Sequence, residues 1–296
     1  MKLHEPVLPR ENSEDGIDRR GGRLGDILVE LEKLDARDVR RVLDLQRADR
    51  LRFGEAALRL GLIGEHELRQ AIAKQYELPY LSPSSARISS ELIVALEPLH
   101  SRSEELRALR TQLLIRWLNA STGPRMLAVV SPGSAEGRSY LAANLALAFA
   151  QLGERTLLVD ADFRSPRQHR IFGVSDQVGL SAVLSGRADI RAAVTLPQFG
   201  AFSLLPAGAS PPNPQELLLR PHLITLVQES RNAFDVVLFD TPPAKLYADA
   251  QCLALRGANA VVLARKDHTR YTDVAEVIRG LASAGVSVIG TILNEF

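Results

Sequence analysis

The C-terminal two thirds of the chain alternate short apolar runs with longer mixed segments. The apolar runs have the length and character of buried strands, and they cover residues 126–130, 157–159, 236–239, 260–263 and 286–293. Residues 141–150 are mostly small and apolar, which is typical of a buried helix, and further helices are expected near 247–255 and 272–284. Short continuous apolar strands separated by helices predict a parallel sheet flanked by helices.

The N-terminal third carries an internal repeat, with apolar residues three and four positions apart. One copy runs from Arg23-Leu24-Gly25 to Gln46 and the other from Arg52-Phe53-Gly54 to Gln75; each spans 24 residues, and residues 47–51 separate them. Two copies of one unit with helical spacing predict two helix pairs, whose turns fall near Asp35 and Gly64.

These patterns divide the chain into four parts. Residues 1–20 are polar and lack apolar periodicity, which is typical of a mobile arm, and residues 21–80 hold the helical tandem-repeat domain. Residues 81–100 contain prolines and a serine cluster, which favours a linker with one short helix around 90–96. Residues 101–296 then form the sheet domain.

A glycine-bearing turn connects the first predicted strand to the first predicted helix of that domain. Its sequence, residues 131–139, is S-P-G-S-A-E-G-R-S. Successive backbone N–H groups in such a turn, together with the helix N-terminus, form a cradle for phosphate. Relative to the pattern G-x-x-x-x-G-K-[ST], Pro132 replaces a glycine and Arg138 replaces the lysine, while Ser139 stands where a magnesium-ligating hydroxyl is expected. The predicted nucleotide-binding residues are Gly133, Ser134, Ala135, Glu136, Gly137, Arg138, Ser139 and Tyr140.

Carboxylates follow two of the other predicted strands. Asp160 and Asp162 belong to D-A-D-F-R after the second strand, and Asp240 opens D-T-P-P after the third. Carboxyl ends of parallel strands meet at one sheet edge, so these groups are expected to converge on the phosphate loop and to bind a nucleotide with Mg²⁺. The predicted fold class is α/β, a P-loop parallel sheet flanked by helices and preceded by a small all-helical domain.

Composition narrows the classes of partner. The chain of 296 residues has a net charge of +1 at pH 7, which gives no argument for a nucleic acid polymer. Its one cysteine cannot form an internal disulfide, and no apolar run has the length of a membrane span. The expected location is cytoplasmic, with any membrane association coming through a partner.

A charged motif precedes the first strand. Glu104, Arg107 and Arg110 form E-x2-R-x2-R at helical spacing, which usually means a solvated, salt-bridged face. The same motif at this position is the subunit contact of bacterial tyrosine kinases, which assemble as rings. With D-x-D-x-R, D-T-P-P and the segment 205–218, the chain from Glu104 onward resembles this family, and with its helical N-domain it is similar to the EpsG type of exopolysaccharide gene clusters.

The resemblance implies transfer of the ATP γ-phosphoryl group to a tyrosine hydroxyl. Arg138 would stabilise phosphate charge, Ser139 and Asp240 would hold magnesium with support from Asp160, and Asp162 would orient or deprotonate the tyrosine. Asn294, after the last strand, would contact adenine. The partners implied are an inner-membrane chain-length-determinant protein with a cytosolic activating tail, a protein tyrosine substrate and further copies of the chain in a ring.

The N-terminal repeat resembles the N-terminal domain of MshE-type secretion and pilus ATPases, some of which bind cyclic di-GMP. The resemblance implies that the ligand would meet Arg23, Leu24, Gly25, Gln46, Arg52, Phe53, Gly54 and Gln75. An arginine can form paired hydrogen bonds with phosphate or guanine, and a glycine lets the ligand approach the backbone closely. A glutamine amide can hydrogen-bond the base or the phosphate. Glu32 and Ala57 depart from the family pattern. The alternative is a helical docking module.

Two departures keep other functions open for the sheet domain. Arg138 can alter phosphoryl transfer, and the five tyrosines (76, 80, 140, 247 and 271) are scattered rather than clustered in a tail. The alternatives are a nucleotide-gated assembly switch of the export machinery without transfer, and an ATPase like MinD or ParA. D-x-D-x-R and E-x2-R-x2-R argue against the second.

Overall fold

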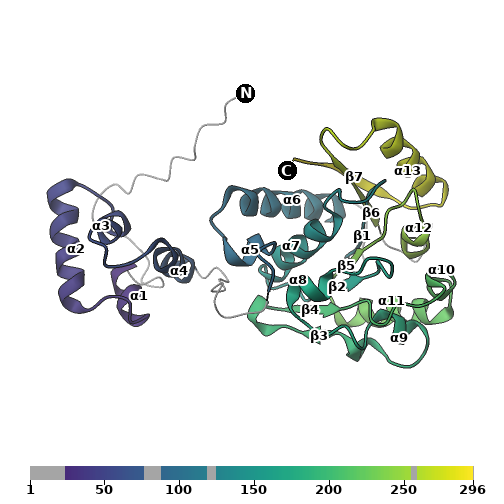
Figure 1. Cartoon of the computed structure of the whole chain (residues 1–296), viewed down its shortest axis with the longest axis horizontal. Coiled ribbons are helices and arrows are strands. Elements are labelled where there is room, and N and C mark those ends of the chain that lie inside the picture. Colours follow the sequence, from purple (N-terminus) through teal and green to yellow (C-terminus); the bar gives the residue numbers. More distant parts are fainter. Residues whose placement is uncertain (1–23, 77–87, 119–124, 255–258, 296) are drawn as a thin grey trace. The chain divides into compact units, whose positions relative to one another are not determined.

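The structure, a computed structural model, describes residues 24–76, 88–118, 125–254 and 259–295. The chain divides into two compact units, residues 1–77 and 78–296, which are described separately (Figure 1). The predicted arm of residues 1–20 and Arg23 lie outside the described residues.

The N-terminal unit confirms the two predicted helix pairs. Its helices are α1 (Leu24–Glu30), α2 (Ala36–Asp49), α3 (Phe53–Arg59) and α4 (Glu65–Gln75). Asp35 begins the second helix of the first copy, where its carboxylate accepts the N–H groups of Arg37 at 2.7 Å and Asp38 at 2.8 Å. In the second copy Glu67 reaches back to the Gly64 N–H at 2.9 Å. Side chains therefore accept N–H groups at both of these helix starts, where no preceding helical turn provides carbonyl acceptors.

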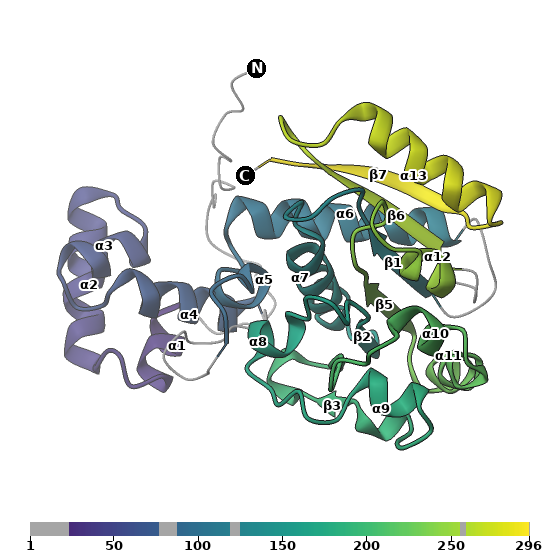
Figure 2. The same cartoon turned by 45° about the vertical axis from the view of Figure 1, so that its right-hand side comes forward.

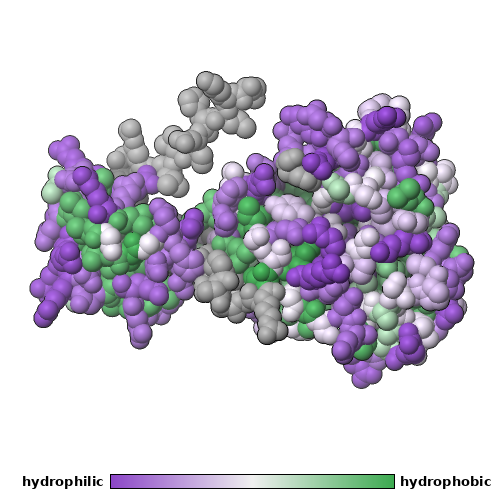
Figure 3. Space-filling model, in the orientation of Figure 1, coloured by the Kyte–Doolittle hydropathy of each residue, from purple (hydrophilic) through white to green (hydrophobic). Residues whose placement is uncertain are grey.

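The core of this unit is small. Leu28, Val42, Ala56 and Ala57 are fully buried in it, and several neighbouring apolar side chains are only partly covered. On the face seen in Figure 3, hydrophobic residues of this unit gather in the middle and hydrophilic residues surround them.

The motif glycines of the repeat lie inside that core. A Cβ at Gly25 would stand 3.0 Å from the Phe53 ring, and one at Gly54 would stand 2.7 Å from a Leu68 methyl. Both glycines therefore allow two helices to pack closely, which gives them a structural reason to be in the motif.

Among the described residues of the second unit, seven strands form one sheet in the order β3-β4-β2-β5-β1-β6-β7. Every pairing is parallel except that of β3 with β4. The strands are β1 (Arg125–Val130), β2 (Thr156–Asp160), β3 (Val194–Thr195), β4 (Phe202–Leu205), β5 (Val236–Asp240), β6 (Asn259–Arg265) and β7 (Val288–Asn294). The predicted fold class is confirmed, and β3 and β4 are strands that the apolar pattern did not reveal.

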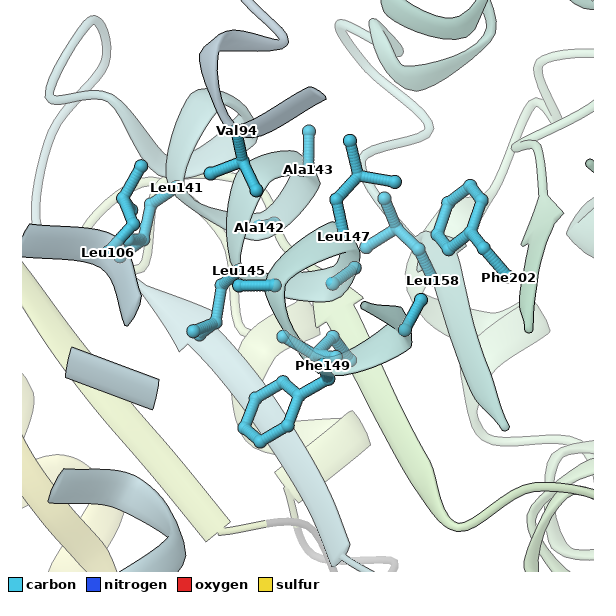
Figure 4. Close-up of a cluster of buried hydrophobic side chains, with 14 of the residues drawn as sticks. Val94, Leu106, Leu141, Ala142, Ala143, Leu145, Leu147, Phe149, Leu158 and Phe202 are labelled. Carbon is cyan, nitrogen blue, oxygen red and sulfur yellow. The ribbon is translucent and has the colours of Figure 1, made fainter. Parts of the chain in front are cut away.

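Helices cover both faces of this sheet (Figure 2). They are α5 (Ile93–Leu96), α6 (Ser101–Leu118), α7 (Arg138–Ala150), α8 (Gln168–Phe172), α9 (Leu180–Leu184), α10 (Pro214–Leu218), α11 (Pro221–Ala233), α12 (Asp249–Ala254) and α13 (Tyr271–Ser283). Every residue of α7 from Leu141 onward is buried, because α5 and α6 cover the side of this helix that faces away from the sheet. Figure 4 shows Val94 and Leu106 beside Leu141, and Phe149 further along α7.

The short helix predicted around residues 90–96 is present as α5, and the described part of the predicted linker, from residue 88 onward, packs with the second unit. Leu92 and Val94 are fully buried against α7, and Asn144 of that helix accepts the Val94 N–H at 3.1 Å and donates to the Glu91 carbonyl at 2.8 Å. The apolar run 92–96 drives this packing, and it outweighs the turn signal of the nearby proline. Residues 81–87 lie outside the described part of the chain.

Candidate nucleotide and magnesium site

The phosphate loop connects β1 to α7 at the carboxyl end of the sheet. Gly137 begins α7 with φ 98°, a left-handed conformation that favours glycine. The Glu136 carboxylate is buried and accepts the Gly133 N–H at 2.8 Å and the Thr269 hydroxyl at 2.5 Å. The segment after β6 therefore braces the loop from outside, while Ser134 and Ala135 remain exposed at its tip.

Arg138 closes the inner side of the loop. The side chain is buried, and its Nε donates to the Thr241 carbonyl at 2.7 Å. Its Nη1 donates to the Ser131 hydroxyl and to the Gly133 carbonyl, both at 2.5 Å. Burial lowers the pKa of Arg138, and the charge of Asp240 opposes that shift. The arginine in the lysine position is thus held by one loop carbonyl, one loop hydroxyl and the carbonyl of Thr241 after β5.

Asp160 and Asp240 meet directly beneath the loop. The two residues are register partners on β2 and β5, and both are fully buried. Burial raises the pKa of Asp240, and it raises the pKa of Asp160 well above its ordinary value with a further contribution from the Asp240 charge. The nearby Ser139 hydroxyl opposes the rise in the pKa of Asp240, and the Gln168 amide bonds both residues, at the Ser139 carbonyl and the Asp240 Oδ2. The structure therefore brings these three predicted magnesium residues together.

Asp162 lies on the loop after β2 and is held in one orientation. Its Oδ1 accepts the N–H groups of Arg164 at 3.1 Å and Ser165 at 2.9 Å. The Arg164 guanidinium lies 3.7 Å above the Tyr247 ring and pairs with Asp249 at 3.4 Å. Asp249 is a fourth acidic side chain of this region, fully buried, and burial raises its pKa. It was missed because it begins a helix after D-T-P-P and belongs to no motif.

Sequence reasoning also missed Gln168, a fully buried side chain at the start of α8. Its amide donates to the Asp240 Oδ2 at 2.8 Å and to the Ser139 carbonyl at 3.0 Å, and its backbone N–H donates to the Asp160 Oδ2 at 2.9 Å. The residue follows a polar stretch, R-S-P-R, so no apolar period or acidic motif indicated it.

Two buried acceptors in this network support a magnesium site. Within the described part of the chain, Asp240 Oδ1 and Gln168 Oε1 have no hydrogen-bond partner. Among those residues no three His, Cys, Asp or Glu side chains gather closely enough to hold a metal ion by themselves. Mg²⁺ favours few protein ligands, with water and phosphate oxygens completing its shell, so a hydroxyl and one carboxylate fit it.

Two further predicted nucleotide contacts, Asn294 and Tyr140, have the following surroundings. Asn294 donates its amide to the Glu136 carbonyl at 3.0 Å, so it braces the phosphate loop. The half-buried Tyr140 lies among charges of Arg102, Glu105 and Glu91, and burial raises its pKa.

The predicted subunit motif is partly turned inward. Glu104 pairs with Arg107 at 3.0 Å, and the glutamate side chain is 74% exposed. Arg107 donates to the Pro98 carbonyl at 2.6 Å and Arg110 to the Ala148 carbonyl at 2.9 Å. Both arginines keep a buried N–H group without a partner in the described structure.

In the N-terminal unit, the candidate residues of the repeat lie at helix ends. The helix α1 begins with Leu24 and Gly25. The helix α3 begins with Phe53 and Gly54, directly after the exposed Arg52. The two glutamines lie in the last turns of the other helices, Gln46 in α2 and Gln75 in α4. α1 packs on α4, and α2 packs on α3.

Comparison with known proteins agrees with this geometry. Residues 127–296 match the family described as the CobQ/CobB/MinD/ParA nucleotide binding domain, which defines a class of P-loop proteins. The tyrosine-protein kinase YwqD of Bacillus subtilis is 34% identical over 71% of this chain and 87% of its own. The chain belongs to the bacterial tyrosine-protein kinases of this class.

Solved structures give the same placement. The chimerical protein CapA2B2 has a TM-score of 0.65 at 29% identity and covers 76% of this chain and 98% of its own. The septum site-determining protein MinD of Pyrococcus horikoshii, solved with Mg-ADP, has a TM-score of 0.50 at 28% identity and covers 57% of this chain and 70% of its own.

No helix among the described residues is long and apolar enough to cross a membrane.

Proposed function

We propose that the chain is an ATP-dependent protein-tyrosine kinase that regulates polymerisation and export of a capsular or extracellular polysaccharide. The observation that carries the proposal is the buried network in which Ser139, Asp160 and Asp240 meet beneath the phosphate loop. This arrangement resembles the nucleotide site that P-loop enzymes use for phosphoryl transfer, where positioning and charge stabilisation supply most of the catalysis.

Each residue then has a role in transfer to a tyrosine hydroxyl. The loop N–H groups and the α7 N-terminus would bind the ATP phosphates, and Arg138 would stabilise their charge. Ser139 and Asp240 would hold Mg²⁺, with Asp160 beside them; the ion would neutralise charge on the phosphates. Asp162, held by two backbone N–H groups, would accept the proton of the tyrosine hydroxyl through its other oxygen.

A direct test incubates the purified chain with ATP and Mg²⁺, with a tyrosine-containing peptide added in one arm. Mass spectrometry should find phosphotyrosine on the chain or on the peptide. Binding of Mg-ATP without any phosphotyrosine would favour the second proposal, a nucleotide-gated assembly switch. The observation that supports the switch is the buried Arg138, whose bonds to the loop must rearrange when phosphate arrives.

The Arg138→Lys variant separates these two functions. Lysine is too short to keep all three bonds of the guanidinium, so we expect a loss of stability of about 1–2 kcal/mol. The freed ammonium group can follow the γ-phosphate, and we expect phosphoryl transfer to rise roughly tenfold. Thermal melting and a radiolabel-transfer assay measure the two effects, and equal transfer rates in both proteins would show that the arginine does not limit catalysis.

The partners we propose follow the family. A chain-length-determinant protein of the inner membrane would hold the chain at the membrane and activate it, and Glu104, Arg107 and Arg110 would contact the next copy in a ring. A relative solved as a chimerical protein supports a second polypeptide. The units proposed are an arm at 1–20, the repeat domain at 21–80 and the kinase domain after the connecting segment.

For the repeat domain we propose control by cyclic di-GMP. The confirmed helix pairs support it, because Arg52 is exposed directly before α3, where its guanidinium can bind a phosphate. In the full chain, Arg52→Ala should weaken binding of cyclic di-GMP about tenfold or more, measured by calorimetry. Arg40→Ala, which removes an exposed arginine of α2 outside the motif, should leave the affinity unchanged. Equal loss in both variants, or no binding by the parent chain, would favour the docking module.

A further inference from the structure

The short helix α8 brings one amide side chain into the centre of the nucleotide site. Gln168 is its first residue and is fully buried. The site lies between β2 and β5, and α8 contacts α7, the helix that carries Ser139. Gln168 is therefore placed where it can contact the phosphate loop and both acidic strand ends at once.

Each N–H group of Gln168 donates a hydrogen bond to a residue that was predicted to hold magnesium. The side-chain amide donates one hydrogen to the Asp240 Oδ2 at 2.8 Å and the other to the Ser139 carbonyl at 3.0 Å. The backbone N–H donates to the Asp160 Oδ2 at 2.9 Å. An amide has two N–H donors, so none remains for another partner.

The helix that carries Gln168 is fixed in place by aromatic packing. The Phe172 ring stacks on Phe202 with a centroid distance of 4.8 Å and meets the edge of Phe199 at 5.5 Å. These rings are buried among the strands and helices of one sheet face. Because α8 is short and held at its far end, the position of the amide is set by the core and not by solvent.

The bonds of Gln168 also leave particular oxygen atoms free. The Asp240 Oδ2 accepts the glutamine amide. In the described structure, neither the Asp240 Oδ1 nor the Gln168 Oε1 has a hydrogen-bond partner. Two acceptors that are buried without donors are costly, and a hydrated cation would satisfy both.

We infer that Gln168 is a positioning residue of the magnesium site, which fixes the Asp240 carboxylate with one oxygen toward the metal and ties it to Ser139 and Asp160. The inference rests on the proposed function, because it needs a Mg-nucleotide in this site. Without the amide, the Asp240 carboxylate can rotate away from the neighbouring Asp160, and the metal ligand loses its orientation. Residues that orient metal ligands typically contribute 10- to 100-fold to metal affinity.

The test compares Gln168→Met with Gln151→Met in the full chain. Methionine keeps most of the volume of glutamine and removes its donors. Gln151 lies beyond the opposite end of α7, where its amide donates to the Val94 carbonyl at 3.2 Å, so it is a matched control outside the site. The measurement is the dissociation constant of ADP by calorimetry, with EDTA and then over a Mg²⁺ titration.

In the Gln168→Met variant we expect the apparent Mg²⁺ affinity of the ADP complex to fall about 10- to 100-fold. Its ADP affinity in EDTA should stay within about twofold of the parent, because the loop N–H groups are unchanged. Gln151→Met should match the parent in both measurements. A purely structural role for Gln168 predicts instead equal losses with and without the metal.

The possible outcomes are distinct. If Mg²⁺ does not improve ADP binding by the parent chain, the proposed function fails. If the parent responds to Mg²⁺ and Gln168→Met responds equally, the positioning role is overturned while the proposed function stands. If Gln168→Met does not fold, Gln168→Asn decides in the same way, because it keeps an amide that is one methylene too short to reach both acceptors.

Discussion

Replacing Asp162 by asparagine should abolish most phosphoryl transfer while leaving nucleotide binding intact. The asparagine oxygen can still accept the two N–H groups that hold the aspartate, so the loop geometry should survive. The amide cannot take up the tyrosine proton, and loss of a general base typically costs about 10²- to 10⁴-fold in rate. Radiolabel transfer to a tyrosine peptide measures the rate, and calorimetry of Mg-ADP should give an affinity within about threefold of the parent.

Asp189→Asn is the matched control for that experiment. Asp189 forms an exposed ion pair with Arg191, which lowers its pKa to about 2, and it lies outside the site. Transfer by this variant should equal that of the parent chain. If Asp162→Asn transferred at the same rate as Asp189→Asn, another group would have to accept the proton.

Asp240→Asn should make the free protein more stable and remove its response to Mg²⁺. Burial raises the pKa of Asp240, so at neutral pH the folded state bears the cost of a buried carboxylate beside Asp160. An uncharged amide of the same shape relieves about 1–2 kcal/mol of this cost. A domain of this size should then melt about 2–8 °C higher. Because the amide is a poor magnesium ligand, the added stability that Mg-ATP gives the parent should largely disappear.

The same substitution at Asp235, just before β5, should act in the opposite direction. The Arg155 ion pair lowers the pKa of Asp235, so its ionised form stabilises the fold above the ordinary pKa of an aspartate and the benefit is lost on acidification. Asp235→Asn should therefore reduce stability at neutral pH, by less than about 1 kcal/mol because the pair is exposed. It should also keep the full response to Mg-ATP. Two variants that both lowered the melting temperature would contradict the assigned cost at Asp240.

The parts of the site that could be predicted from the sequence are those that follow from the strand pattern and from motif residues at the strand ends. A continuous apolar strand that ends in a turn or a carboxylate is readable without a structure, which is why Ser139, Asp160 and Asp240 were expected to meet and do so. Arg138 was recognised as a departure, but its bonds to Thr241 and Ser131 depend on folding of distant strands.

The residues that escaped prediction are those whose role depends on tertiary contacts. Gln168 lies in a segment that reads as a loop, and Asp249 lies in a predicted helix outside any motif; burial alone gives them importance. Asn294 was expected near adenine from its position after the last strand, yet its amide bonds the loop carbonyl. In the repeat, the helix pairs were predictable from apolar spacing, whereas the packing of Phe53 on Gly25 depends on how α1 and α3, which belong to different copies, lie against each other.

The entry of the chain into its α/β unit has a mechanical consequence. Ser89 donates its N–H to the Ile171 carbonyl at 2.9 Å, and Glu91 pairs with Arg167 at 2.8 Å, so both grip residues on either side of Gln168. Any displacement of residues 89–91 would therefore move the residues that flank Gln168, and with them the amide that holds the Asp240 carboxylate.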